Sequence, residues 1–166
     1  MRLYFLRHSD AAERDPDKYP DDGQRPLTEA GIRKMAAIAQ ALYEMNPKID
    51  LVLSSPFLRA RDTAEIARKS LHIKKDRLIL VDQLAPLGDA RQLIAEIKVK
   101  YSFDSLLLVG HEPDLSGLIS LLLSGEPSLS ITMKKGGMCC LSVEELKPGK
   151  CAALEWLINP AQFEII

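Results

Sequence analysis

The sequence has almost no net charge, few cysteines and no long apolar segment. Its formal net charge is -1 over 166 residues, which gives no general positive field for nucleic acid or an anionic membrane surface. An anion-binding site must therefore come from a few well-placed cations. The longest apolar run, residues 118–123, is interrupted by Ser120 and is too short to span a bilayer.

The three cysteines are Cys139, Cys140 and Cys151. Their number is odd, their spacing fits no common zinc pattern, and adjacent residues on a strand point to opposite faces. We interpret them as small apolar residues in a reducing compartment, and we expect no metal site. The apolar stretch 3–6 is too short for the hydrophobic region of a signal peptide. These features predict a soluble, cytoplasmic protein.

Hydrophobic residues make up 46% of the sequence, enough for a sizeable core, and the length suits a single domain over residues 1–166. Apolar runs and amphipathic stretches alternate along the chain. We expect strands at 3–6, 51–53, 78–81, 106–109, 138–143 and 152–158, and helices at about 29–45, 56–71, 91–100 and 113–123. This alternation predicts an α/β fold in which a mostly parallel central sheet lies between two layers of helices.

The first helix has clear boundaries. Thr28 can cap its N-terminus, and Asn46-Pro47 ends it. Its apolar face is expected to consist of Ile32, Met35, Ala36, Ala39, Leu42 and Tyr43.

Polar side chains that can handle phosphate follow three of the predicted strands. The first strand ends at Arg7-His8, the second leads through residues 54–56 to Arg59, and the fourth ends at Gly110-His111. Ligands of parallel sheets bind beyond the carboxyl ends of the strands. The sequence therefore predicts that two histidines and two arginines meet at one edge of the sheet.

Each of these groups has an ordinary structural explanation when taken alone. Arg7-His8 can be a polar strand end, Arg59 can belong to a solvated basic helix face, and His111 can be a buried histidine bonded to a backbone carbonyl. Their joint occurrence just after strands is harder to explain by chance. The third histidine, His72, lies at the end of a helix, where the helix dipole favours it.

Four segments resemble the motifs of the histidine phosphatase (phosphoglycerate mutase-like) superfamily. They are Leu-Arg-His at 6–8, Arg-Pro-Leu-Thr-Glu-Ala-Gly at 25–31, Ser-Ser-Pro at 54–56 followed by Arg59-Ala60 and Thr63-Ala64, and Val-Gly-His-Glu-Pro at 109–113. They occur in the family's order over nearly the whole chain. The short length and the segments at 25–28 and 110–113 are similar to the SixA-type phosphohistidine phosphatase branch. The resemblance implies a three-layer αβα sandwich of the phosphoglycerate mutase-like type.

The resemblance also implies roles for the four residues. His8 is expected to be the nucleophile, and Arg7, Arg59 and His111 are expected to bind the phosphoryl group. A neutral imidazole can attack phosphorus, and its other nitrogen must then donate to a fixed acceptor, which we expect to be a backbone carbonyl of the following loop. Guanidiniums offer forked donors to phosphoryl oxygens. His111, if protonated, adds another donor.

Three further positions bear on this pocket. Arg59 is preferred to Arg61 because the two lie about 200° apart around a helix and the Pro-x-x-Arg-Ala spacing selects Arg59. Ser9 stands where the family commonly has glycine, and it either narrows the loop or adds a hydroxyl that contacts the substrate. Thr28 is expected to act chiefly as a helix cap, with a second possible role beside the bound substrate.

A proton donor for the leaving group is harder to find. Relatives that act on phosphate esters usually carry a carboxylate after the third strand, where this sequence offers Asp82 and Asp89. Each can equally be a turn residue or a helix cap. A phosphorylated imidazole whose ring carries a proton leaves without acid catalysis, whereas an alkoxide needs it. The weak signal for an acid therefore favours phosphohistidine as the substrate.

The leading hypothesis is a phosphatase without cofactor or metal that removes phosphate from a histidine on a protein phosphotransfer domain. The alternative enzyme acts on a small phosphorylated metabolite, with Asp82 or Asp89 as the acid. A mutase is less expected, because a short chain gives little shielding from water. The non-enzymatic alternative is a phosphohistidine-binding module. We expect neither nucleic acid nor a membrane as a partner.

Overall fold

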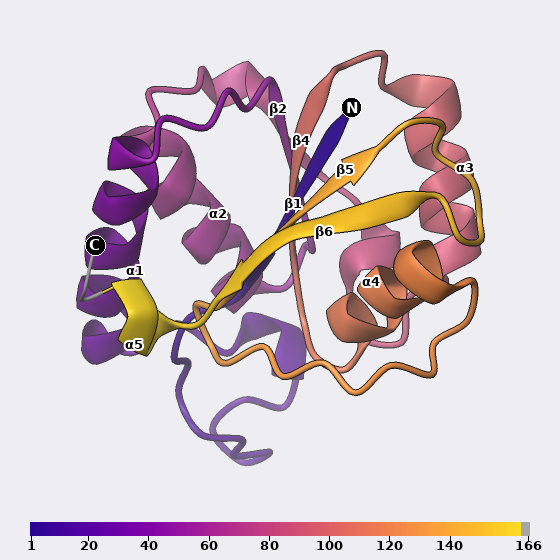
Figure 1. Cartoon of the computed structure of the whole chain (residues 1–166). Helices are drawn as coiled ribbons and strands as arrows, with labels where there is room; N and C mark the ends of the chain where they lie inside the picture. Colours follow the sequence, from indigo (N-terminus) through magenta and orange to yellow (C-terminus); the bar gives the residue numbers. More distant parts are fainter. Residues whose placement is uncertain (164–166) are drawn as a thin grey trace.

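The computed structural model describes residues 1–163, which form a six-stranded sheet with the order β3-β2-β4-β1-β5-β6 (Figure 1). The first four strands in that order run parallel, and β5 runs antiparallel to both of its neighbours. The predicted mostly parallel sheet is confirmed. The strands are β1 Arg2–Arg7, β2 Leu51–Ser54, β3 Leu78–Leu80, β4 Ser105–Gly110, β5 Met138–Val143 and β6 Ala152–Ile158.

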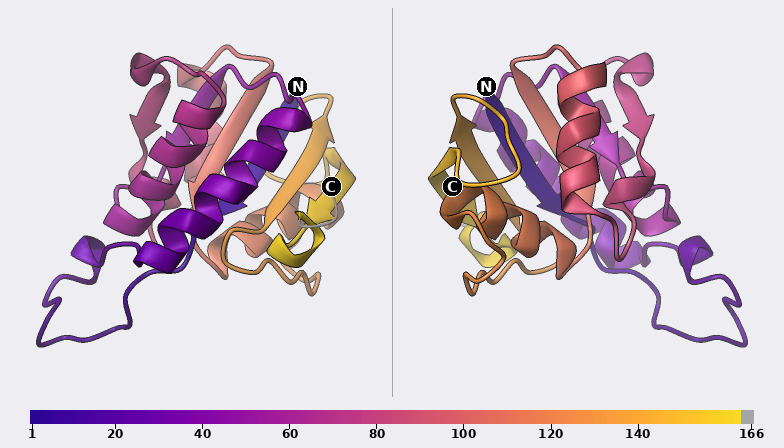
Figure 2. Two further views of the ribbon diagram at one scale, coloured as in Figure 1. Left: turned by 90° about the vertical axis from the view of Figure 1, so that its left-hand side faces the viewer. Right: turned by 90° about the vertical axis from the view of Figure 1, so that its right-hand side faces the viewer.

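Helices cover both faces of this sheet, which confirms the three-layer arrangement (Figures 1 and 2). On one face, α1, α2 and α5 pack on Tyr4 and Leu6 of β1, and on the other α3 and α4 pack on Leu3 and Phe5. Successive side chains of a strand point to opposite faces, so β1 supplies both cores. The helices are α1 Glu29–Glu44, α2 Leu58–Ser70, α3 Ala90–Lys100, α4 Asp114–Ser124 and α5 Pro160–Phe163, with single 3₁₀ turns η1 Asp22–Gln24, η2 Lys75–Arg77 and η3 Asp82–Leu84.

The buried face of α1 differs from the predicted one. Met35, Ala39 and Leu42 are buried as expected, but Ile38 completes the stripe, and Ile32 and Tyr43 are 47% and 46% exposed; Ala36 is also exposed. Positions 35, 38, 39 and 42 form one continuous stripe along a helix of 3.6 residues per turn. Positions 32, 36 and 43 lie at the margins of this stripe and are therefore exposed.

Most predicted boundaries shift by one or two residues. Helix α2 begins at Leu58 with Phe57 as its cap, two residues later than Pro56, and β3 ends one residue earlier than predicted. Within residues 1–163, no helix has the length and apolar character that crossing a membrane requires. The segment between β1 and α1 extends away from the three layers beyond the carboxyl end of β1 (Figure 2).

Candidate active site

Three strands end level with one another at one edge of the sheet. Arg7 in β1 pairs with Gly110 in β4, and Ser54 in β2 pairs with Val109. The residues that follow these strand ends therefore meet. The rings of His8 and His111 lie 5.0 Å apart between centroids, so the predicted convergence of the two histidines is confirmed.

His8 is held in one tautomer by its own loop. Its Nδ1 lies 2.7 Å from the carbonyl oxygen of Ser9, and a carbonyl only accepts hydrogen bonds. The proton of the neutral ring therefore sits on Nδ1, and Nε2 keeps its lone pair. The predicted backbone acceptor is confirmed.

The surroundings of His8 keep its ring neutral. Burial lowers the pKa of His8 to about 4, and the charges of Arg59 and Arg7 act in the same direction, whereas the bond to Ser9 opposes them. At neutral pH the imidazole is uncharged, which is the form that attacks phosphorus.

Both arginines are anchored by their outer nitrogens. Arg7 Nη1 donates to the carbonyl of Met133 over 2.7 Å. Arg59, only 4% exposed, donates from Nη1 to the Asp22 carbonyl over 2.9 Å, and its Nη2 lies 3.0 Å from the Asp22 carboxylate. Arg61 has a half-exposed side chain on the surface. Arg59 is therefore the buried arginine of this helix, and its role in the site stays a prediction.

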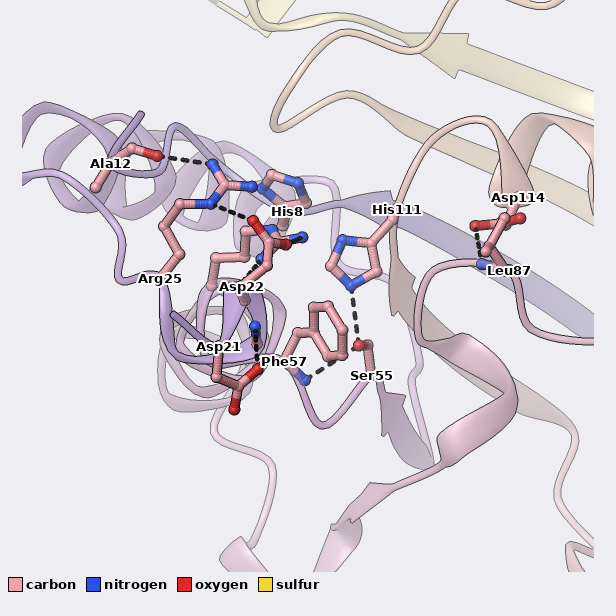
Figure 3. A network of polar contacts seen from close by, with 12 residues as sticks. His8, Ala12, Asp21, Asp22, Arg25, Ser55, Phe57, Leu87, His111 and Asp114 are labelled. Carbon is pink, nitrogen blue, oxygen red and sulfur yellow. Dashed lines mark hydrogen bonds and ion pairs between the residues drawn. The ribbon is translucent and has the colours of Figure 1, made fainter. Parts of the chain in front are cut away.

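His111 has one bound and one unbound ring nitrogen. Its Nε2 lies 2.9 Å from the hydroxyl of Ser55, and its other nitrogen faces the side of the ring where His8 lies (Figure 3). Burial lowers the pKa of His111 to about 3, and the nearby His8 and Arg59 add to the effect. The edge of Phe57 packs against the ring, with centroids 5.4 Å apart.

Three buried nitrogens of this group have no hydrogen-bond partner among residues 1–163: Arg7 Nε, Arg59 Nε and His111 Nδ1. An unsatisfied buried donor costs about 1–3 kcal/mol, and native structures rarely contain one without a reason. All three can donate. Donors of this kind are the groups that bind oxyanions in proteins.

A carboxylate, Asp22, lies between two arginines of the site. Its Oδ1 is 2.9 Å from Arg25 Nε, and its Oδ2 is 3.0 Å from Arg59 Nη2. Burial acts to raise the pKa of Asp22, but the bond from Arg25 and the charge of Arg59 outweigh it and hold the pKa below its usual range. Arg25 also donates to the carbonyl of Ala12 (Figure 3). Asp22 was not predicted as a site residue, because it lies in an acidic loop whose path the sequence does not show.

A sequence model of the histidine phosphatase superfamily (branch 1) matches residues 3–83, which include Arg7, His8 and Arg59. The chain is also 27% identical over 167 residues to the phosphohistidine phosphatase SixA of Escherichia coli, which covers 99% of this chain and 98% of SixA. The first half of the chain is therefore similar to the histidine phosphatase superfamily, and nearly the whole chain is similar to SixA.

Two further similarities extend over most of the chain. An uncharacterized protein of Picosynechococcus is 36% identical over 143 residues, covering 83% of this chain and 82% of that protein. The solved structure of the protein histidine phosphatase SixA complexed with tungstate has a TM-score of 0.81 at 26% identity, and the match covers 98% of this chain and 99% of that one. The predicted phosphoglycerate mutase-like fold is confirmed.

One more carboxyl lies beside the site, and it was not among the candidate acids predicted from the sequence. Glu112 follows His111, and burial raises its pKa, although the bonds from Ser116 and the charge of Arg7 oppose the effect. Its two oxygens accept hydrogen bonds from the backbone N–H and the hydroxyl of Ser116, over 3.2 and 2.6 Å. Glu112, which precedes the N-cap Pro113, thereby satisfies one free N–H of the first turn of α4.

Two residues predicted to contact substrate have other roles. Ser9 is fully buried, and its hydroxyl donates to the carbonyl of Gly31 over 2.8 Å, so it ties the loop to α1 instead of lining the pocket. The hydroxyl of Thr28 caps α1 by accepting from Gly31 N–H over 2.9 Å. It also lies 3.3 Å from the carbonyl of Asp10. The preferred capping role of Thr28 is confirmed, and these contacts turn both hydroxyls toward α1 and its loop.

The two predicted acids lie on the β3–α3 connection. Asp89 caps α3, with Oδ1 accepting from the backbone of Arg91 and Gln92 over 2.7 and 3.1 Å. Asp82 is exposed at the start of η3. Among the hydrogen bonds and ion pairs of residues 1–163, none connects either carboxylate to His8 or His111. Both positions fit the turn and cap roles that the sequence left open.

Proposed function

We propose that the protein is a phosphatase in which His8 takes the phosphoryl group. Nε2 of His8 attacks phosphorus, the bond from phosphorus to the leaving group breaks, and a water molecule then hydrolyses the phosphorylated His8 to release inorganic phosphate. The observation that carries this proposal is the set of three unpaired nitrogens from Arg7, Arg59 and His111 around a neutral imidazole. Such preorganised donors stabilise the charge of the transferring group. The tungstate named with the related SixA structure is a tetrahedral oxyanion of the same shape.

We further propose that the substrate is a phosphohistidine on a protein. Its leaving imidazole keeps a proton and needs no acid, which agrees with the engagement of Asp89 as a helix cap and the exposure of Asp82. The similarity to SixA over nearly the whole chain points to the same class of substrate.

The rim of the site also favours a protein substrate. Leu87 is 92% exposed and has a left-handed backbone with φ of 67°, an uncommon conformation for a non-glycine residue, which costs about 1–3 kcal/mol. Its N–H donates to Asp114 Oδ2 over 3.1 Å, and Asp114 begins α4 three residues after His111 (Figure 3). The fold thus holds an apolar side chain out to solvent on a loop bonded to the start of α4, and we propose that a protein substrate contacts it.

The test compares a phosphorylated histidine phosphotransfer domain with an aryl phosphate ester. We expect a kcat/KM at least ten times higher for the phosphoprotein, and equal rates would contradict the phosphohistidine assignment. Leu87→Ser should lower kcat/KM about ten-fold for the phosphoprotein and leave the ester unchanged. The matched control is Val99→Ser, because Val99 is 84% exposed near the far end of α3; it should change neither rate.

One observation favours a second candidate, a phosphatase for small phosphate esters. The raised pKa of Glu112, adjacent to His111, is the property that a general acid needs. If esters are the natural substrate, Glu112→Gln should reduce ester turnover more than ten-fold while phosphohistidine turnover changes little. If phosphohistidine is the substrate, we expect Glu112→Gln to affect both substrates equally and by less than three-fold.

A further inference from the structure

Ser55 connects the second strand of the site to His111. It is fully buried just after β2, and its N–H donates to the carbonyl of Val109 in β4 over 2.9 Å. Its hydroxyl oxygen accepts from the N–H of Phe57 over 3.2 Å and lies 2.9 Å from His111 Nε2 (Figure 3). The hydroxyl is therefore fixed from both sides.

The position of the protons follows from this arrangement. A serine hydroxyl has a single proton to donate. The N–H of Phe57 already uses one of its acceptor positions, and within residues 1–163 the acceptor that the Ser55 proton meets is His111 Nε2. If Nε2 carried a proton instead, the buried hydroxyl proton of Ser55 would have no acceptor, which costs free energy.

We propose that Ser55 is a positioning residue that fixes neutral His111 as the Nδ1–H tautomer, so that an uncharged imidazole donates to the phosphoryl oxygen. On the sequence alone, His111 is considered as a donor only if protonated, whereas here the neutral ring is the donor. The proposal rests on the proposed phosphoryl-transfer site, and it assigns the unpaired Nδ1 of His111 as a donor.

His8 and His111 then both carry their proton on Nδ1, but His8 uses its free Nε2 for attack and His111 uses its Nδ1–H for binding. The Ser9 carbonyl accepts from Nδ1 of His8 and leaves a bare Nε2 for attack. The Ser55 hydroxyl donates to Nε2 of His111 and leaves an Nδ1–H for binding. A backbone acceptor and a side-chain donor thus distinguish the nucleophile from the ligand-binding histidine.

The charges around His111 support a neutral ring. Burial is the main influence against a proton on its ring, the charges of Arg59 and Arg25 act in the same direction, and Asp22 is the opposing negative group. A neutral donor also avoids a further buried positive charge beside Arg59 when the site holds no anion.

The direct test is ¹⁵N NMR of the histidine rings in the unliganded full chain at pH 7. The chain has three histidines, so a His111→Asn spectrum identifies the His111 signals. We expect a protonated Nδ1 and an unprotonated Nε2 for His111. The reverse tautomer, or two protonated nitrogens, would overturn the proposal. This readout involves no turnover, so its failure is distinguishable from failure of the proposed activity.

The variant Ser55→Ala tests the cause. We expect the His111 nitrogen signals to move toward values averaged over both tautomers. We also expect kcat on the aryl phosphate to fall about ten-fold, by analogy with the loss when the partner that orients a metal-ligating histidine is removed. Ser54→Ala is the matched control, because Ser54 is an adjacent buried serine whose hydroxyl donates to the Ser55 carbonyl and not to His111. It should leave the His111 signals in place. Unchanged His111 signals in Ser55→Ala would refute the role of Ser55.

Discussion

The titration of His8 provides a quantitative test of the site. Burial and the charges of Arg59 and Arg7 lower its pKa to about 4. At pH 5, roughly nine-tenths of His8 is then neutral, whereas at the ordinary value of 6.5 only about 3% would be. The two cases differ about thirty-fold in the fraction of enzyme that carries a competent nucleophile.

Proton NMR can measure this titration because the chain has three histidines. The ring resonance that disappears in His8→Asn belongs to His8, and it should stay at its neutral position from pH 7.5 down to pH 5. The same chain unfolded in urea supplies the reference titration. A His8 midpoint near 6.5 in the folded protein would refute the reasoning that burial and the arginines hold the ring neutral.

The lowered pKa of His8 also makes the free energy of unfolding depend on pH. Between about pH 6.5 and pH 4 the unfolded chain carries a proton on His8 that the folded chain lacks, so the free energy of unfolding falls as the pH is lowered through this window. The fall of the pKa from 6.5 to about 4 is equivalent to roughly 3 kcal/mol. Urea denaturation at pH 7 and pH 4.5 should show a larger loss for the native sequence than for His8→Asn. Equal losses would mean that His8 does not contribute to acid sensitivity.

Three other substitutions, and one control, test the surroundings of the site. Gly31→Ala should destabilise the fold by about 2–4 kcal/mol, because the added Cβ would lie 2.0 Å from the carbonyl oxygen of Asp10. The control Gly117→Ala, which has open space around the added Cβ, should stabilise the fold by about 0.5–1 kcal/mol. Urea denaturation measures both free energies of unfolding, and similar effects of the two substitutions would exclude the clash at Gly31. Asp22→Asn removes a negative charge beside the site and should tighten competitive inhibition by inorganic phosphate about five-fold, or roughly 1 kcal/mol; weaker inhibition would show that Asp22 mainly orients its arginines. Arg59→Lys should lower kcat at least ten-fold, because lysine cannot reproduce the fork that Asp22 holds, and an unchanged kcat would exclude a role for that geometry.

The four principal site residues could be found from the sequence because each lies next to the end of an apolar run. Strand positions are the most readable feature of an α/β chain, and parallel strands bring their carboxyl ends to one edge. His8 and His111 meet for this reason alone. The prediction of Arg59 required one further argument, namely that Arg59 and Arg61 point in different directions around a helix.

The partners of these residues could not be read in the same way. Asp22 reaches Arg59 through an irregular loop, and no periodicity fixes the path of such a loop. Ser9 and Ser55 both follow strands, yet one hydroxyl faces α1 and the other faces His111. Which way a buried hydroxyl points depends on packing around it, which a single sequence does not display.

The central claim is that His8 carries the phosphoryl group. The most direct measurement mixes the enzyme with a radiolabelled phosphohistidine protein, quenches the mixture in alkali within one turnover, and locates the label by mass spectrometry of the peptides. We predict a phosphoryl group on the peptide that contains His8, stable in alkali and lost in acid, and absent from His8→Asn. Label on another residue of the enzyme, or full turnover by His8→Asn, would contradict the assignment of His8 as the nucleophile.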